Sequence, residues 1–400
     1  MSRVFYSSSV HDQAEIDAVV EVLTSGPQGL WPGKRVSAME RETAALFGNA
    51  RGVMCNSGSS ALYLAVELLE LPPGSEVITC GLTFSTDVAP LVRAGLIPVF
   101  VDVEPDTYCV NVSRIEEMVS DRTRAILIPN LVGNVPDWDA IRAIADRHGL
   151  KVIEDSCDTL GPSLRGSATG KRSDITVTSF ANSHVITCAG NGGMVMFDSD
   201  AWRDRAVMLR RWGRRSELHY YGSKKKERDF WEELDGIRYD NQFIFDELGW
   251  NFEPSEIGAA FGLQQLKKLP GNWERRKRNF RLFTEALGPH GDRFILPRQT
   301  PGVDTTWLGY PLLIRPDAGF ERAGLQQFLD AREIDTRTIW SGNVTRQPMM
   351  KQVGYRLPAD GLPNCDAVME RGVLLPLSHA LSDDDIGFVA GCVVDFLSHG

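Results

Sequence analysis

Short runs of apolar residues alternate with longer segments of helical spacing between about residues 50 and 200. Strand-length apolar runs separated by helices are typical of βαβ units and of a mainly parallel sheet. The helix expected over 61–71 has Glu67 and Glu70 as its only charged residues, so it is predicted to pack against the sheet. Seven strands are predicted, at 53–55, 77–80, 98–103, 125–129, 152–155, 175–179 and 194–197.

The chain changes character after residue 200. A helix is expected over 254–269, and the Pro270-Gly271 pair is expected to end it. We therefore predict a large α/β domain over 1–270 and a small α+β domain over 271–400. The elements expected in the small domain are a strand at 309–314 and helices at 320–332 and 383–397.

Composition limits the class of protein. With 400 residues and 42% hydrophobic content, the chain can bury a large core. No apolar run of about 18 residues is present and residues 1–10 lack a signal segment, so no membrane span and a cytoplasmic location are expected. The net charge of -10 argues against nucleic-acid binding, although basic clusters at 210–215 and 224–226 can line a local anion site. Seven cysteines without a Cys-x-x-Cys pair predict neither disulfides nor a metal site.

Distinctive motifs follow the first two predicted strands. In an open α/β sheet, ligands bind at the carboxyl ends of the strands. The 56–60 segment, Asn-Ser-Gly-Ser-Ser, precedes a helix. Either its free backbone amides bind a phosphate, or Ser59 or Ser60 simply caps the helix. Phe84, within the 81–86 motif, either stacks on a flat ring or packs in the core.

Two further strand ends carry ionisable residues. The 154–158 segment, Glu-Asp-Ser-Cys-Asp, closes an apolar strand with carboxylates. A carboxylate in that position needs a cationic partner, and a protonated pyridine nitrogen is one; capping of the next helix is the alternative, more for Glu154 than for Asp155. Ser179 is followed five residues later by His184 and then by a glycine turn at 190–193. A histidine after a strand is often structural, so its meaning depends on the order of the four motifs.

In this order the motifs resemble those of fold-type-I pyridoxal phosphate enzymes, and the chain is similar to the family that aminates or deoxygenates nucleotide-linked sugars. The similarity covers nearly the whole length, including 15–48, 130–136, 249–251 and 336–348. It implies an aspartate-aminotransferase-like α/β fold with a mainly parallel seven-stranded sheet flanked by helices, plus the smaller C-terminal α+β domain.

The resemblance also implies roles for matching residues. Gly58, Ser59 and Ser179 are expected to hold the cofactor phosphate. Phe84 is expected to stack on the pyridine ring, and Asp155 to pair with the ring nitrogen. Further cofactor contacts are expected from Cys157 and Asp158, and substrate contacts from Arg337, Asn343 and Arg346.

Asn251 is expected to reach the cofactor phosphate of a neighbouring subunit. The resemblance therefore implies a homodimer with shared active sites. The implied substrate is a sugar attached to a nucleotide.

His184 stands where the family's aminotransferases have their Schiff-base lysine. An imidazole cannot form that stable covalent link, so the cofactor is expected to be held noncovalently, as pyridoxamine phosphate. An ordinary pKa of about 6.5 suits imidazole to proton transfer near neutral pH. The 3-dehydratases of nucleotide-linked 4-keto-6-deoxyhexoses are similar in this histidine, in the 155–158 pattern and in the 343–348 stretch. The resemblance implies imine formation at the 4-ketone, proton removal by His184 and loss of the hydroxyl at carbon 3.

Several alternatives stay open. No cysteine lies between Cys188 and Cys365, so an intrinsic iron–sulfur cluster is not expected. Turnover can then end in hydrolysis, with glutamate as amino donor, or in reduction by an external flavoprotein or ferredoxin system. Around His184 the chain departs from the dehydratases at 181–182, Val185 and Asn191, which allows an atypical sugar substrate. The competing interpretations are a sugar aminotransferase, another pyridoxamine-phosphate-dependent lyase, and a degenerate partner subunit.

Overall fold

A seven-stranded sheet forms the centre of the computed structural model, which describes residues 3–225 and 231–399. The strand order is β1-β9-β8-β5-β4-β2-β3. Only β9 runs antiparallel to its neighbours β1 and β8; the other neighbouring pairs are parallel. All seven predicted strands are present and the mainly parallel sheet is confirmed. Their bounds are Arg51–Cys55 (β1), Glu76–Cys80 (β2), Ile97–Val101 (β3), Thr123–Pro129 (β4), Lys151–Asp155 (β5), Ile175–Ser179 (β8) and Gly193–Phe197 (β9).

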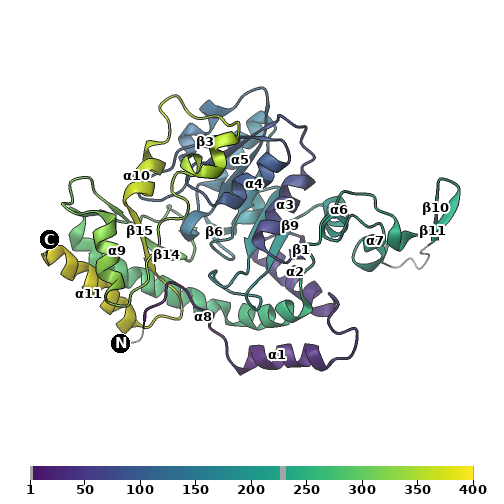
Figure 1. Ribbon diagram of the computed structural model, residues 1–400, viewed down its shortest axis with the longest axis horizontal. Coiled ribbons are helices and arrows are strands. Elements are labelled where there is room, and N and C mark those ends of the chain that lie inside the picture. Colours follow the sequence, from purple (N-terminus) through teal and green to yellow (C-terminus); the bar gives the residue numbers. More distant parts are fainter. Residues whose placement is uncertain (1–2, 226–230, 400) are drawn as a thin grey trace.

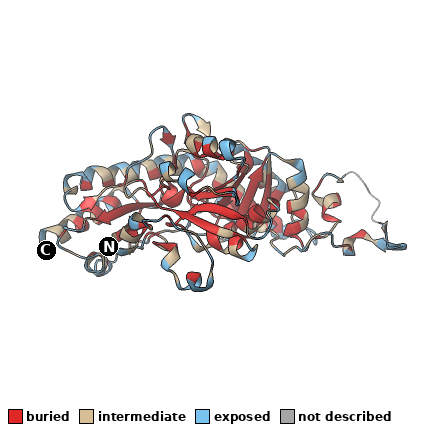
Figure 2. Cartoon of the chain, turned by 90° about the horizontal axis from the view of Figure 1, so that it is seen from above, coloured by how far each residue is buried: buried red, intermediate tan, exposed pale blue. Residues whose placement is uncertain are grey.

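Helices cover both faces of this sheet, so its strands are buried (Figures 1 and 2). Alternate residues of the strands belong to different apolar clusters, as the two-residue period of a strand requires. Helices α3 (Gly58–Leu68) and α6 (Asp200–Arg210) pack on one face. Helices α2 (Lys34–Phe47), α5 (Trp138–His148) and α8 (Glu256–Leu287) pack on the other. The buried helix predicted after β1 is therefore confirmed as α3.

The predicted end of a helix at residue 269 is wrong. Helix α8 continues to Leu287 with Pro270 in its interior. Pro270 is exposed, so its ring faces solvent and water can solvate the carbonyl that loses its hydrogen bond. Because α8 crosses the expected domain boundary, the division of the chain near 270 stays a prediction.

The C-terminal part of the chain is an α+β unit that packs on the sheet. Its three-stranded antiparallel sheet has the order β12-β14-β15. One apolar cluster includes side chains of both sheets, such as Ile78 and Leu312. The elements are β12 (Phe294–Ile295), β14 (Gly309–Ile314), β15 (Gly372–Pro376), α9 (Arg322–Asp330), α10 (Pro363–Arg371) and α11 (Asp383–His399).

Two segments leave the main body. Helix α1 (Gln13–Thr24) packs along α8, and a hairpin of β10 (Trp231–Leu234) and β11 (Ile237–Asp240) projects outward (Figure 1). We call residues 231–248 the arm. Among the described residues no helix has the length and hydropathy needed to cross a membrane. The remaining elements are α4 (Ser85–Arg93), α7 (Glu217–Tyr220), β6 (Ser163–Leu164), β7 (Ser167–Ala168) and β13 (Val303–Asp304).

Carboxylates pair with the arginines of the 210–215 cluster, so this cluster is not an open anion site. Lys226, from the other basic cluster, lies outside the described residues. The pairs are Arg210 with Glu40, Arg211 with Glu253, Arg214 with Glu217, and Arg215 with Asp246.

Gly193, the first residue of β9, packs closely against the 56–60 segment. A Cβ atom on Gly193 would lie 2.2 Å from the carbonyl carbon and oxygen of Ser57. We expect Gly193→Ala to lower the free energy of unfolding by about 1–3 kcal/mol, as overpacking does. The matched control is Gly391→Ala in α11, where a Cβ meets nothing within 4 Å. Thermal unfolding of both variants tests this, and equal midpoints would contradict it.

Candidate active site

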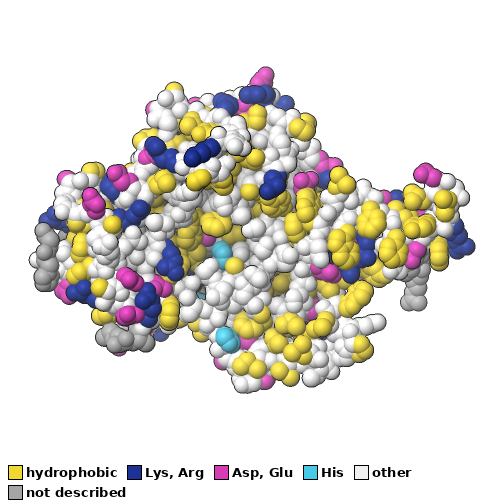
Figure 3. Space-filling view, viewed as in Figure 1, with side chains coloured by type: hydrophobic (Ala, Val, Ile, Leu, Met, Phe, Trp, Pro, Cys, Tyr) yellow, Lys and Arg dark blue, Asp and Glu magenta, His cyan; other side chains and the backbone are white. Residues whose placement is uncertain are grey.

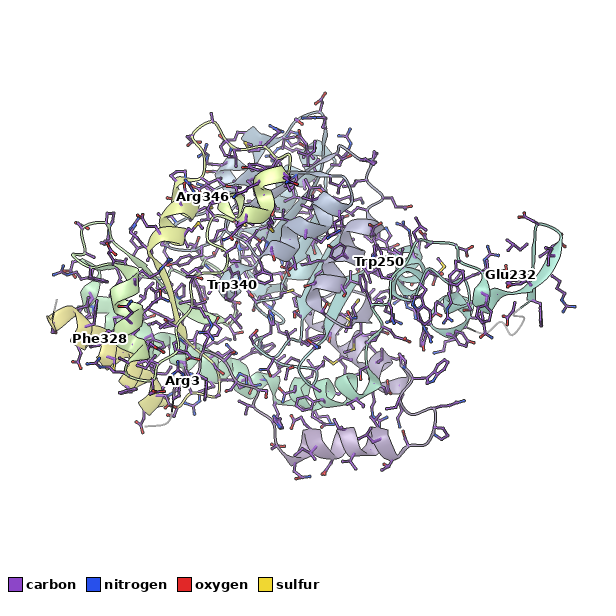
Figure 4. The ribbon with its side chains drawn as sticks, in the orientation of Figure 1. Arg3, Glu232, Trp250, Phe328, Trp340 and Arg346 are labelled. Carbon is purple, nitrogen blue, oxygen red and sulfur yellow. The ribbon has the colours of Figure 1, made fainter. Side chains whose placement is uncertain are left out.

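A cavity of about 650 Å³ lies at the carboxyl ends of the central strands. This volume is within the range of small-molecule sites. Its walls come from the loops after β1, β2, β4, β5 and β8, together with Tyr6 near the N-terminus and Trp340 from the C-terminal unit. Figure 4 shows Trp340 between that unit and the central sheet. The predicted residues that line the cavity are Gly58, Ser59, Phe84, Asp155, Cys157, Asp158, Ser179, His184 and Arg337.

The start of α3 offers backbone N–H groups to the cavity. Ser57 caps this helix by accepting the N–H of Ser60 at 3.1 Å. The first N–H groups of a helix have no acceptor within it, and Gly58 and Ser59 occupy these positions. Gly58 packs so closely on Ser179 that a Cβ atom would lie 2.7 Å from the Ser179 Cβ. The cap is therefore Ser57 and not Ser59 or Ser60, and anion binding by the N–H groups of Gly58 and Ser59 stays a prediction.

Asp155 and Glu154 face different surroundings although they are adjacent in β5. Glu154 accepts hydrogen bonds from Asn130 and Thr169 at 2.8 and 2.6 Å and lies outside the cavity wall, so its role is structural. Asp155 lines the cavity, is 6% exposed and accepts the N–H of Cys157 at 2.9 Å. Burial raises the pKa of Asp155. A cationic group in the cavity would balance this carboxylate, and a protonated pyridine fits that requirement.

Phe84 is not a core residue, so the core interpretation of this aromatic is wrong. Its side chain lines the cavity and is 54% exposed, although it lies just before α4 in a buried part of the chain. An exposed aromatic face on a cavity wall is suited to stacking against a flat ring.

His184 has a defined orientation. Its Nδ1 contacts the backbone carbonyl oxygen of Cys157, which can only accept, so Nδ1 carries the proton. The other ring nitrogen, Nε2, is then an unprotonated acceptor. Burial lowers the pKa of His184 to about 4, so the ring is neutral near pH 7. A neutral imidazole with one free nitrogen can accept a proton.

Asp158 links two walls of the cavity. Its Oδ2 accepts the backbone N–H of Val132 at 2.8 Å and the indole N–H of Trp340 at 2.7 Å. Burial, and secondly the nearby Asp155 charge, raise the pKa of Asp158 to about 7. Trp340 has a left-handed backbone with φ of 43°, and this hydrogen bond helps to hold the strained loop.

Three predicted residues lie elsewhere. Asn251 is exposed beside Asn56, and its side-chain oxygen accepts the N–H of Glu253. Asn343 and Arg346 do not line the cavity because both side chains bind Asp366. Asn343 also caps a 3-10 turn, so the structure gives it a positioning role. Substrate contacts by Asn343 and Arg346 stay a prediction.

Several residues of the wall were not singled out from the sequence, among them Tyr6, Asp87 and Trp340. Asp87 lies one residue beyond the 81–86 motif, and a polar residue in the first turn of a helix after a strand end was a usable signal. No local pattern marks Tyr6. Trp340 lies within the 336–348 stretch, where Arg337, Asn343 and Arg346 were the residues expected to act.

Comparison with known proteins agrees with this geometry. The family model for the DegT/DnrJ/EryC1/StrS aminotransferase family matches residues 10–394. The chain belongs to this family. A dTDP-4-dehydro-2,6-dideoxy-D-glucose 3-dehydratase of Saccharopolyspora spinosa is 37% identical to it, with 98% of this chain and 86% of that protein covered. A GDP-4-keto-6-deoxy-D-mannose 3-dehydratase of Yersinia pseudotuberculosis is 30% identical, with 88% and 89% covered.

Solved structures of the family have the same fold. The GDP-4-keto-6-deoxy-D-mannose-3-dehydratase of E. coli with bound hydrated PLP superimposes with a TM-score of 0.87 at 26% identity, covering 98% of this chain and 100% of that chain. The predicted fold type is therefore confirmed. Membership of this family places the chain among the pyridoxal-phosphate-dependent enzymes that modify sugars.

The orientation of His184 can be tested by nuclear magnetic resonance. With selectively 15N-labelled histidine, we expect the His184 signals to show a neutral ring protonated at Nδ1. They should not titrate between about pH 5.5 and 8, because the pKa lies near 4. The signals are assigned by their loss in His184→Gln. An Nε2-protonated ring, or a midpoint near 6.5, would contradict the orientation derived from the Cys157 carbonyl.

Proposed function

We propose that this protein is a pyridoxamine-phosphate-dependent 3-dehydratase of a nucleotide-linked 4-keto-6-deoxy sugar. The observation that carries the proposal is His184 at the lysine position, neutral and with Nε2 free beside the cavity. When bound, the cofactor supplies an amine that condenses with a ketone and a ring that accepts electrons.

The residues of the cavity suit the parts of this cofactor. The N–H groups of Gly58 and Ser59 and the hydroxyl of Ser179 would bind its phosphate at the start of α3. Phe84 and Asp155 also line the cavity, where Phe84 would stack on the ring and Asp155 would accept the N–H of the pyridine.

His184 provides the base. Its Nε2 takes the proton that must be removed before the hydroxyl at carbon 3 can leave, while the Cys157 carbonyl keeps the ring in the required tautomer. The thiol of Cys157 packs beside Gly58, where burial raises its pKa well above the ordinary value and keeps it uncharged.

Arg337 is the residue best placed for the substrate. Its guanidinium lies over the Tyr6 ring on the cavity wall, and its side chain is 54% exposed. This position suits the diphosphate of a nucleotide sugar, and relatives named as 3-dehydratases act on dTDP- and GDP-linked sugars. Glutamate-dependent hydrolysis or an external reductase would complete turnover. An aminotransferase is the second candidate, because a putative pyridoxal phosphate-dependent aminotransferase of Bacillus subtilis is 28% identical to this chain.

The proposed active form is a homodimer. The arm carries a series of apolar side chains, and a second group lies on and after α1; apolar surface of both segments is visible in Figure 3. Apolar surface on a projecting segment is typical of a protein interface. Figure 4 shows Glu232 on the arm and Trp250 at its base, next to Asn251. Exposed apolar residues of the arm are Trp231, Leu234, Ile237, Tyr239, Phe243, Phe245 and Leu248, and those near α1 are Ile16, Val20, Leu23, Leu30 and Trp31.

His184→Asn should retain the cofactor and lose elimination. Asparagine keeps a polar group of similar reach but cannot act as the base, so we expect the rate to fall by about 10²–10⁴-fold. Equilibrium dialysis against pyridoxamine phosphate and chromatography of the product measure the two effects separately.

His184→Lys is the complementary variant. The introduced amine should link covalently to pyridoxal phosphate, which mass spectrometry detects after borohydride reduction, and activity should move toward amino transfer. Undiminished elimination by His184→Asn would remove the central role of this residue.

Sharing of active sites is tested with two inactive variants, His184→Asn and Asn251→Ala. When they are co-expressed in equal amounts, half of the dimers are mixed and each mixed dimer regains one complete site. We therefore expect about one quarter of wild-type activity. No recovery would show that Asn251 serves its own subunit, and full activity of Asn251→Ala alone would show that it serves neither.

A further inference from the structure

Asp87 is a buried carboxyl group in the cavity wall to which no role has been assigned. It lies in the first turn of α4 and is fully buried. The Thr83 hydroxyl donates to its Oδ2, whereas its Oδ1 is buried and receives no donor from the described residues. A buried carboxylate oxygen without a donor is destabilising, so this oxygen needs a proton or a partner.

The neighbour of Asp87 is Asp155. Both carboxyl groups line the same cavity although they come from different loops, and they lie close enough to affect each other's protonation. Two ionised carboxylates that lie close together in a buried site repel each other, so one of them keeps a proton. Burial first, and then the Asp155 charge, raise the pKa of Asp87 well above its ordinary range. Asp155 accepts the backbone N–H of Cys157 at 2.9 Å, which favours its ionised form, whereas the Oδ1 of Asp87 has no donor among the described residues, so the shared proton belongs on Asp87.

Other groups near Asp87 support the same assignment. The carboxyl group of Asp158 adds further negative charge and raises the pKa of Asp87. The thiols of Cys80 and Cys157 are buried with strongly raised pKa values, so they stay neutral and provide no countercharge. The N-terminus of α4 is the opposing influence, since it favours an ionised Asp87.

We infer that Asp87 is a positioning residue that holds the proton shared with Asp155 and donates it as a hydrogen bond, leaving Asp155 ionised toward the pyridine nitrogen of the cofactor. A carboxylate that already accepts a hydrogen bond is a weaker base. Asp155 therefore does not remove the proton of the pyridine nitrogen, and the ring keeps the positive charge that makes it a strong electron acceptor. This inference rests on the proposed pairing of Asp155 with the ring nitrogen.

The experiment uses full-length protein loaded with pyridoxamine phosphate that carries 15N in its pyridine ring. The 15N chemical shift reports directly whether the nitrogen is protonated, independently of turnover. We expect a protonated nitrogen in wild type at pH 7. Asp87→Asn should behave like wild type, because its amide donates to Asp155 as the protonated acid does. Asp87→Leu removes the donor, so the nitrogen should lose its proton at a pH at least one unit lower than in wild type.

A titration to alkaline pH separates this role from simple packing. Wild type should lose its native 15N shift when Asp87 finally ionises, whereas Asp87→Asn should not show this transition. If Asp87→Leu fails to fold, the comparison of wild type with Asp87→Asn still decides. A nitrogen in Asp87→Asn that loses its proton as early as in Asp87→Leu would overturn the inference.

Asp155→Asn separates a failure of the proposed pairing between Asp155 and the ring nitrogen from a failure of the role of Asp87. An unprotonated nitrogen in wild type, or one insensitive to Asp155→Asn, would contradict the pairing itself. A nitrogen that depends on Asp155 but is unchanged in Asp87→Leu would contradict the role of Asp87 alone.

Discussion

The site depends on one constraint, the carboxylate of Asp155 at the carboxyl end of a buried strand. The last four residues of β5, ending in Asp155, are buried. Two like charges about 4 Å apart repel by about 4 kcal/mol at an effective dielectric constant of about 20. The start of α4 offers the Asp87 carboxyl only about 0.3–1 kcal/mol in return. Among the described residues, the cavity wall has three carboxyl groups, those of Asp87, Asp155 and Asp158, but one guanidinium, that of Arg337, and a cationic ring fits this excess of acid.

The short loop directly after β5 orients His184 and supports two walls of the cavity. The carbonyl of Cys157 fixes the tautomer of His184, and the carboxylate of Asp158 binds both Val132 and Trp340. Residues that differ in chemistry are thus held by one segment directly after β5. A change in this loop would therefore disturb several parts of the cavity wall together.

The order of motifs was enough to predict the fold and most of the cavity wall. The strand ends at 55, 80, 155 and 179 lie at one edge of the sheet because parallel strands share their direction, so local signals in sequence became neighbours in space. Contributions from outside that rule were not predictable. Trp340 reaches the cavity through the packing of the C-terminal unit, and Pro270 is tolerated within α8 because its ring faces solvent. The positive charge of Arg346 suits the expected substrate contact, but only the structure shows that this side chain pairs with Asp366.

The most direct test of the central claim is the mass of the sugar formed by the wild-type protein. The protein is loaded with pyridoxamine phosphate and mixed with a nucleotide-linked 4-keto-6-deoxyhexose, with glutamate in one sample and a flavin reductant in another. Loss of the oxygen at carbon 3 is the predicted result, and dependence on the reductant would identify how turnover ends. A product that keeps this oxygen and gains an amine would contradict the account and make the protein an aminotransferase with histidine at the lysine position.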